Sequence, residues 1–182
     1  YTKTKEEKMS DIIHKLAVSG IVAIICFGAY MSYTGYQNDV YPMDQSIGLF
    51  DRIMASSEPK TIITDINAIK SFIPTEGNAV WLFPTETTNF SRIQADLDVM
   101  AASAVKTSAV PRDSSAFHTG MMDISLRAEI IQENMMDIVP YMYASVSNIL
   151  FTCVWIAAII GIFTILKRKK QHLESFDKSK GV

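Results

Sequence analysis

The strongest constraint on the fold is the uncharged run at residues 149–166, which is followed by four consecutive cations at 167–170. A helix on the surface of a soluble domain needs a polar face. Every residue of this run is apolar, small or a hydroxyl residue that can bond to its own helix backbone. At about 1.5 Å rise per residue, its eighteen residues span roughly 27 Å, close to the ~30 Å hydrocarbon core of a bilayer. The run predicts a transmembrane helix over residues 147–166.

A second uncharged run covers residues 16–36 and ends in the aromatic residues Tyr30, Tyr33 and Tyr36, which suit a membrane interface. A secretory signal peptide is the alternative, because lysines precede the run. Its length exceeds the usual signal core, and Met31–Ser32–Tyr33 is a poor cleavage site for signal peptidase. We therefore expect an uncleaved transmembrane helix over residues 16–36.

The charges predict the topology. Residues 1–15 hold four Lys against three acids, and residues 167–182 hold six Lys or Arg against two acids, whereas residues 37–146 hold seven Lys or Arg against fourteen acids. Cations concentrate on the cytoplasmic side of membrane proteins. We expect an integral protein of the plasma membrane or an equivalent energy-converting membrane. Segment 1–15 and the basic tail 167–182 would be cytoplasmic, and residues 37–146 extracytoplasmic.

The central segment has the periodicity of packed helices, so the expected fold class is all-α. From Asp113, a plausible N-cap, apolar or small residues recur in steps of four and three, a period of 3.5 residues. We expect Pro140 to kink or break this helix near the membrane surface. The repeating positions are Phe117, Met121, Ile124, Ala128, Ile131, Met135, Ile138 and Met142.

Three further stretches carry a similar pattern, so residues 37–146 are expected to form a small helical bundle between the two membrane helices. Asp44 would cap the first, Pro59 would lie near the first position of the second, and the third follows Asn89. Their apolar positions are Ile47, Phe50 and Met54; Ile62, Ile66, Ile69 and Ile73; and Phe90, Ile93, Leu97, Met100 and Ala104.

Residues 74–84 interrupt the helical period. Bounded by Pro74 and Pro84, they read as a turn and an extended apolar segment. One interpretation is that Val80, Trp81 or Leu82 plugs the end of the bundle. The other is that Trp81 and Phe83 are exposed and dock on a partner or enter the membrane interface.

Candidate chemistry is sparse. His118, Met121 and Met122 form a weak copper-type candidate, but no spacing typical of a metal site occurs, and we expect neither metal nor cofactor. The chain lacks phosphate-loop, nucleophile-elbow and kinase motifs, so we expect no enzyme activity in it and regard a small-molecule ligand as an unfavoured alternative. The charge of −7 on residues 37–146 argues against nucleic acid. Asn89–Phe90–Ser91 matches the N-glycosylation pattern.

Small residues occur at helical spacing in both apolar runs. Such residues let membrane helices approach closely, which predicts contact between the two helices or with other membrane subunits. The residues are Ser19, Gly20, Ala23, Gly28, Cys153, Ala157 and Gly161.

Two functions fit this organisation. The first is a non-catalytic accessory subunit of a respiratory, photosynthetic or monooxygenase-type membrane complex, which contributes two membrane helices and an outer helical domain that packs on partner subunits. The second is a membrane-anchored sensor. In layout alone the chain is similar to the input half of bacterial and archaeal chemoreceptors. Its sixteen residues after Leu166 are too few for a signalling module, so a sensor would relay through a partner.

Overall fold

The computed structural model describes the backbone of residues 5–180 and the side chains of Ile12, residues 15–168 and Gln171. Within this described range the protein is 82% helical and contains no strand, which confirms the all-helical class. The chain divides into two compact units. The terminal unit consists of Tyr1–Thr34 with Ser147–Val182, and the central unit is Gly35–Val146.

The terminal unit contains the two long apolar helices. α1 covers Lys5–Gly35 and α6 covers Val146–Lys180; all of their residues except Gly35 and Val146 belong to this unit. Both are long and apolar enough to cross a membrane, and no residue in the most apolar window of either helix is buried by the rest of the chain. The sequence prediction of two such helices is therefore confirmed.

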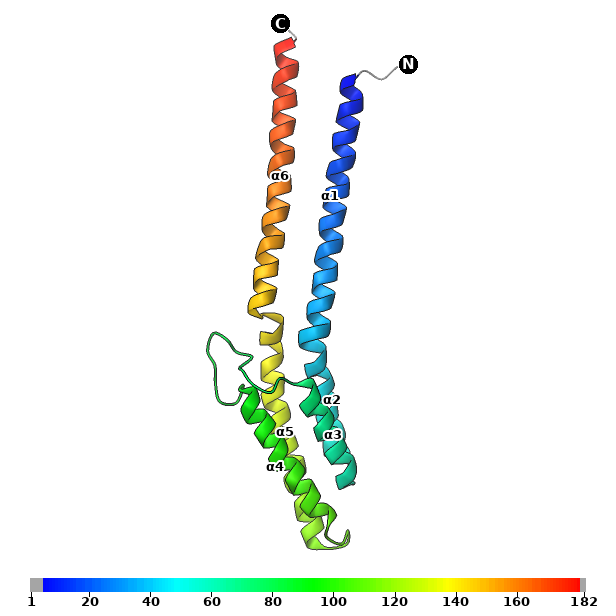
Figure 1. The fold of residues 1–182 in the computed structure, drawn as a ribbon, viewed down its shortest axis with the longest axis vertical. Helices are drawn as coiled ribbons and strands as arrows, with labels where there is room; N and C mark the ends of the chain where they lie inside the picture. Colours follow the sequence, from blue (N-terminus) through cyan, green and yellow to red (C-terminus); the bar gives the residue numbers. More distant parts are fainter. Residues whose placement is uncertain (1–4, 181–182) are drawn as a thin grey trace. The chain divides into compact units, whose positions relative to one another are not determined.

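The central unit begins with a short π-helix, η1 (Tyr36–Val40), followed by α2 (Tyr41–Ala55), α3 (Pro59–Phe72), α4 (Phe90–Ser108) and α5 (Ser115–Tyr143). Each of the last four helices packs on two others in the cyclic order α2, α3, α4, α5, and η1 packs on α2 and α5. Figure 1 shows these helices running alternately along the unit.

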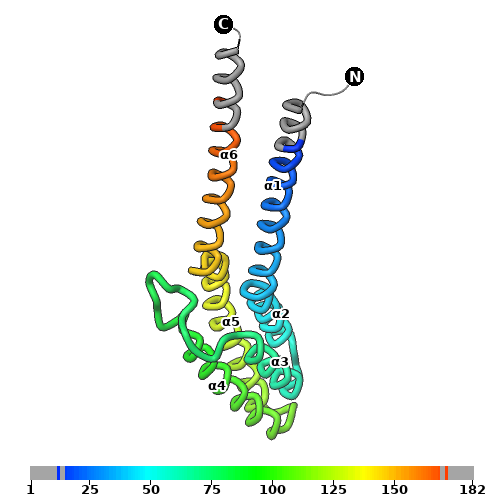
Figure 2. The backbone as a smooth tube through the Cα atoms, turned by 45° about the horizontal axis from the view of Figure 1, so that its top comes forward, coloured from blue at the N-terminus to red at the C-terminus, as the bar shows by residue number. Residues whose placement is uncertain are grey.

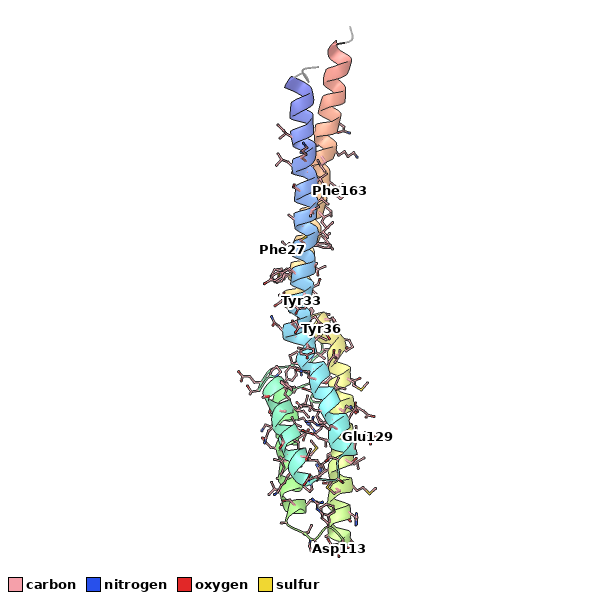
Figure 3. The ribbon with its side chains drawn as sticks, turned by 90° about the vertical axis from the view of Figure 1, so that its right-hand side faces the viewer. Phe27, Tyr33, Tyr36, Asp113, Glu129 and Phe163 are labelled. Carbon is pink, nitrogen blue, oxygen red and sulfur yellow. The ribbon has the colours of Figure 1, made fainter. Side chains whose placement is uncertain are left out.

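The alternation divides the loops of the central unit between its two ends. The start of α2, the end of α5 and the α3–α4 loop lie at one end, named here the entry end, because the chain enters and leaves the unit there (Figure 2). The α2–α3 and α4–α5 connections lie at the opposite end, where Arg112 Nη2 donates to Glu58 Oε1 at 3.3 Å. Figure 3 labels Tyr36 near the entry end and Asp113 at the far end.

The core of the central unit is built from the predicted apolar positions of α3, α4 and α5. Completely buried side chains come from every helix, among them Phe50, Ile66, Leu97 and Met135. Each such side chain contributes about 1.5–3 kcal/mol by leaving water. Apolar burial is thus the main force that holds the four helices together.

The structure extends the expected apolar face of α2 and corrects the expected cap. As expected, Phe50 is buried and Ile47 and Met54 pack at the edge of the core. Met43 and Ile53, which the pattern did not include, are buried as well. The helix begins at Tyr41 rather than at a cap on Asp44, which lies in its first turn. The earlier start adds Met43 to the buried face and shifts the centre of that face.

Two helix starts follow from residues close to them in the sequence. Ser114 Oγ accepts from Phe117 N at 3.2 Å and caps α5, so the cap lies one residue after the expected Asp113. Pro59 occupies the first turn of α3 as expected, where a missing N–H costs nothing.

An ion pair joins α2 to α3. Asp65 is buried, with 1% of its side chain exposed, and its carboxylate accepts from both Nε and Nη2 of Arg52, whose side chain is 60% exposed. The hydrogen bonds from Arg52 and the charge of Asp65 raise the pKa of Arg52 above its ordinary value. The guanidinium therefore stays charged and compensates the buried carboxylate.

The junction between α5 and α6 contains the expected short break, but it does not coincide with the proline. Pro140 lies inside α5, and the helical backbone is interrupted at Ala144 and Ser145. Ala144 N donates to Pro140 O at 3.3 Å and ends α5. On the other connection, no non-helical residue separates α1, η1 and α2.

Candidate interaction surfaces

The α3–α4 loop is a closed, internally hydrogen-bonded segment. Asn78 Nδ2 donates to Thr85 O at 2.8 Å, while Asn78 Oδ1 accepts from Val80 N and from the hydroxyl of the buried Thr88, both at 2.9 Å. Gly77 has a φ of +97°, a conformation that favours glycine, and its carbonyl accepts from Phe90 N at 3.0 Å. These bonds hold the base of the loop against the start of α4.

The closed loop presents three consecutive apolar side chains, named here the loop tip. Trp81 is 47%, Leu82 59% and Phe83 74% exposed, whereas the preceding Val80 is buried. The burial of Val80 agrees with the first interpretation and the exposure of Trp81 and Phe83 with the second, while docking on a partner or the membrane stays a prediction.

The loop tip is attached to the end of α5. Trp81 Nε1 donates to Ala144 O at 3.0 Å, and Ala144 is the residue at which α5 ends before the break. A carbonyl without a partner in its own helix thereby gains a donor. This bond fixes the indole at the entry end of the central unit.

Four tyrosines lie in the elements with which the central unit begins and ends. Tyr36 is the first residue of the π-helix and Tyr41 the first of α2, with ring centroids 6.2 Å apart. Tyr141 and Tyr143 lie in the last turn of α5, and all four tyrosines are exposed. Tyr36 Oη donates to Asp44 Oδ2 at 3.4 Å. Amphipathic aromatic rings of this kind are typical of membrane–water interfaces.

In the terminal unit, α1 and α6 meet at a tryptophan and a glycine. Trp155 Nε1 donates to Ile24 O at 2.9 Å, and a Cβ placed on Gly28 would lie 2.7 Å from the same nitrogen. The indole therefore lies over the glycine, where any larger residue would displace it. Sequence analysis identified Gly28 but missed Trp155; the available signal was an indole N–H inside an apolar run, which needs an acceptor.

The other small residues that we expected at a helix contact are exposed or have open space beside them. Nothing lies within 4 Å of a Cβ placed on Gly20 or Gly161. Ser19, Ala23, Cys153 and Ala157 are exposed, as is Cys26. Their contact with helices of other subunits stays a prediction.

The three residues of the weak metal candidate lie near the start of α5. His118 is exposed and packs edge-on against Phe117, with ring centroids 6.0 Å apart. Met122 is also exposed, while Met121 packs against the hydrophobic core. Among the residues that the structure describes, no three His, Cys, Asp or Glu side chains gather as a metal site would require.

Asn89, the potential glycosylation residue, has a structural role as the N-cap of α4. Its Oδ1 accepts from the backbone N of Ser91 at 3.0 Å and from the Ser91 hydroxyl at 2.6 Å. A glycan would be attached to Nδ2, so the cap and the modification use different atoms. Glycosylation stays a prediction.

No family model, curated protein or solved structure matches this chain.

Proposed function

We propose that this protein is a non-catalytic accessory subunit of a multi-subunit membrane complex of the respiratory, photosynthetic or monooxygenase type. It would contribute two membrane helices and an outer helical domain, the central unit, that packs on partner subunits. Both termini would be cytoplasmic and the central unit extracytoplasmic, as the excess of cations beside the apolar runs indicates.

One observation carries the proposal: among the described residues, the small residues of the two apolar helices other than Gly28 are exposed or have open space beside them. The contact between α1 and α6 uses Trp155 and Gly28, while Cys153 and Ala157 stay exposed and the space beside Gly161 is open. Small residues four apart let another helix backbone approach closely in lipid. Helices of other subunits are the natural occupants of such a face.

Co-purification from native membranes tests the proposal. After extraction in mild detergent, the wild-type chain should migrate on native gels with larger membrane proteins. Ala157→Leu should weaken this association because the larger side chain separates the helix backbones. Val154→Leu is the matched control, since Val154 is exposed on α6 and already bulky. A wild-type chain that migrates as a lone monomer, or identical behaviour of both variants, would count against the proposal.

A sensor is the second candidate, and the uninterrupted helical backbone through α1, η1 and α2 favours it. A continuous helix can transmit a displacement from an outer domain to a membrane helix. A sensor would bind a ligand in the central unit and relay through a partner. Screening the full-length protein for compounds that raise its melting temperature tests this function, because a ligand stabilises the state that it binds.

A further inference from the structure

We propose that the loop tip, Trp81, Leu82 and Phe83, inserts into the headgroup region of the lipid bilayer beside the point where α6 enters it. The inference rests on the proposed function in one respect, that α1 and α6 cross a membrane. It adds a third membrane contact, made by the central unit, and identifies its partner as the lipid surface.

The first argument is the attachment of the tip to the chain that leads into the membrane. Trp81 donates to Ala144 O, and Ala144 precedes the uncharged run at 149–166 by five positions. Five residues extend roughly 8 Å as a helix and at most about 17 Å when fully extended. The headgroup region on each side of the hydrocarbon core is about 5–8 Å thick. Chain length alone therefore keeps the indole close to this region.

The second argument is the topology of the central unit. In an alternating arrangement of four helices, the α3–α4 loop lies at the end where α2 starts and α5 finishes. The chain continues from this entry end into both apolar helices. Figures 1 and 2 show the α3–α4 loop and the end of α5 at the same end of the unit. The exposed Tyr141 and Tyr143 lie in the last turn of α5 at the same end. The tip therefore lies at the end of the unit from which the chain continues into both apolar helices.

The third argument is the chemistry of the tip. Residues 77–85 carry no charge, so their insertion removes no ion from water. Tryptophan and phenylalanine favour the boundary between headgroups and acyl chains. The bonds of Asn78 to Thr85, Val80 and Thr88 already order the base of the loop, so little conformational freedom is lost on insertion.

The size of the tip favours lipid over a protein partner. At 150–250 Å² for each buried aromatic side chain, the exposed parts of the three residues offer roughly 300–400 Å². A stable protein interface needs about 800 Å² from each partner. A bilayer needs no such minimum, because contact grows with each apolar group that enters it.

Tryptophan fluorescence in lipid vesicles tests the inference, since Trp81 and Trp155 are the two tryptophans of the chain. The full-length Trp155→Phe variant, which reports on Trp81 alone, is reconstituted in phosphatidylcholine vesicles and in vesicles whose lipids carry bromine near the headgroup end of the acyl chains. We expect roughly twofold lower Trp81 emission in the brominated vesicles and weak quenching by aqueous iodide, because the indole lies at the interface.

A matched pair of variants separates insertion of the tip from mere proximity to lipid. Replacing Leu82 and Phe83 with Ser in the Trp155→Phe background should abolish most of the bromine quenching. Replacing Val99 and Val105, two exposed residues of α4, with Ser should leave it unchanged. Circular dichroism checks that each variant keeps its helical content. Unchanged quenching after loss of Leu82 and Phe83 would overturn the inference.

The complementary Trp81→Phe variant reports on Trp155 inside α6 and distinguishes failure of the inference from failure of its premise. If deep bromines quench Trp155 but Trp81 is open to iodide and unaffected by bromine, the helices span the membrane and the tip does not enter it. If bromine quenches neither tryptophan, the membrane-spanning premise itself is wrong. If Trp81 is protected from iodide in native membranes but not in lipid vesicles, the partner of the loop tip is a protein rather than lipid, and the inference is overturned.

Discussion

Thr107 on α4 and Gly120 on α5 meet so closely that a Cβ on the glycine would lie 2.3 Å from the Thr107 hydroxyl oxygen. Thr107 is buried, and its hydroxyl donates to Ser103 O at 2.9 Å, which holds the side chain in place. The absence of a side chain at position 120 therefore sets how closely the two helices approach.

Gly120→Ala should destabilise the central unit for this reason. Overpacking a tight contact costs about 1–3 kcal/mol, more than the gain in helix propensity. Adding Thr107→Ala, which removes the clashing atoms, should recover much of the loss. Thermal unfolding of the full-length protein in mild detergent measures both effects.

Gly48→Ala is the matched control for this substitution. Gly48 is an exposed residue of α2, and nothing lies within 4 Å of a Cβ placed there. Alanine should therefore stabilise the protein by about 0.5–1 kcal/mol through the backbone alone. Equal melting temperatures for the variants at positions 48 and 120 would show that the α4–α5 contact is looser than described.

The ion pair between Arg52 and Asp65 predicts an asymmetric response to substitution. Arg52→Met leaves a buried carboxylate without its partner, whereas Asp65→Asn leaves a guanidinium that already reaches water. The melting temperature should fall further for Arg52→Met. Arg127→Met, which removes an exposed partner of Asp123, should change it little. A larger effect at position 127 than at position 52 would contradict this account.

The contribution of Arg52 should not vary between about pH 7 and pH 10. Hydrogen bonding to Asp65 raises the pKa of Arg52, so its stabilising contribution is complete below the ordinary arginine pKa and is lost only as pH rises through the raised value. The difference in melting temperature between the wild type and Arg52→Met should thus stay constant over this range. A difference that shrinks steadily towards pH 10 would show that another titrating group controls the contact.

Gly28→Ala should displace Trp155 within the terminal unit. The added methyl group would overlap the indole ring and break its hydrogen bond to Ile24 O. In a Trp81→Phe background, the emission maximum of Trp155 should shift, whereas Gly20→Ala, at an open position, should leave it unchanged. Identical spectra for the two variants would place the indole elsewhere.

Periodicity predicted most of the helical fold because burial repeats regularly along a packed helix. The apolar positions of α4 were all correct, and those of α5 either are buried or pack at the edge of the core. The expected cap of α2 was wrong, because this helix begins at Tyr41, directly after the π-helix, and has no side-chain cap. A helix start without a side-chain cap leaves no residue signature, and Met43 in the first turn was missed as a buried position.

The candidate surfaces were harder to predict because they depend on contacts between distant residues. Composition identified Trp81 and Phe83 as exposed candidates, but the hydrogen bond from Trp81 to Ala144 O joins positions 63 residues apart. Likewise, small residues identified Gly28, but only the fold brings Trp155 against it. A local sequence pattern describes one element, whereas each of these contacts forms only when the fold brings two elements together.

Asn89 offers a last test, because its capping role and its glycosylation motif respond to different substitutions. Asn89→Ala removes the acceptor for Ser91 N and should cost about 1 kcal/mol of stability, the usual value for an N-cap. Asn89→Asp keeps an acceptor oxygen and should be nearly neutral, yet it removes the glycan attachment site. Thermal unfolding measures the cap, and a change in mass on glycosidase treatment of the native protein measures the glycan. Equal destabilisation by Ala and Asp would show that the side-chain acceptor does not stabilise the start of α4.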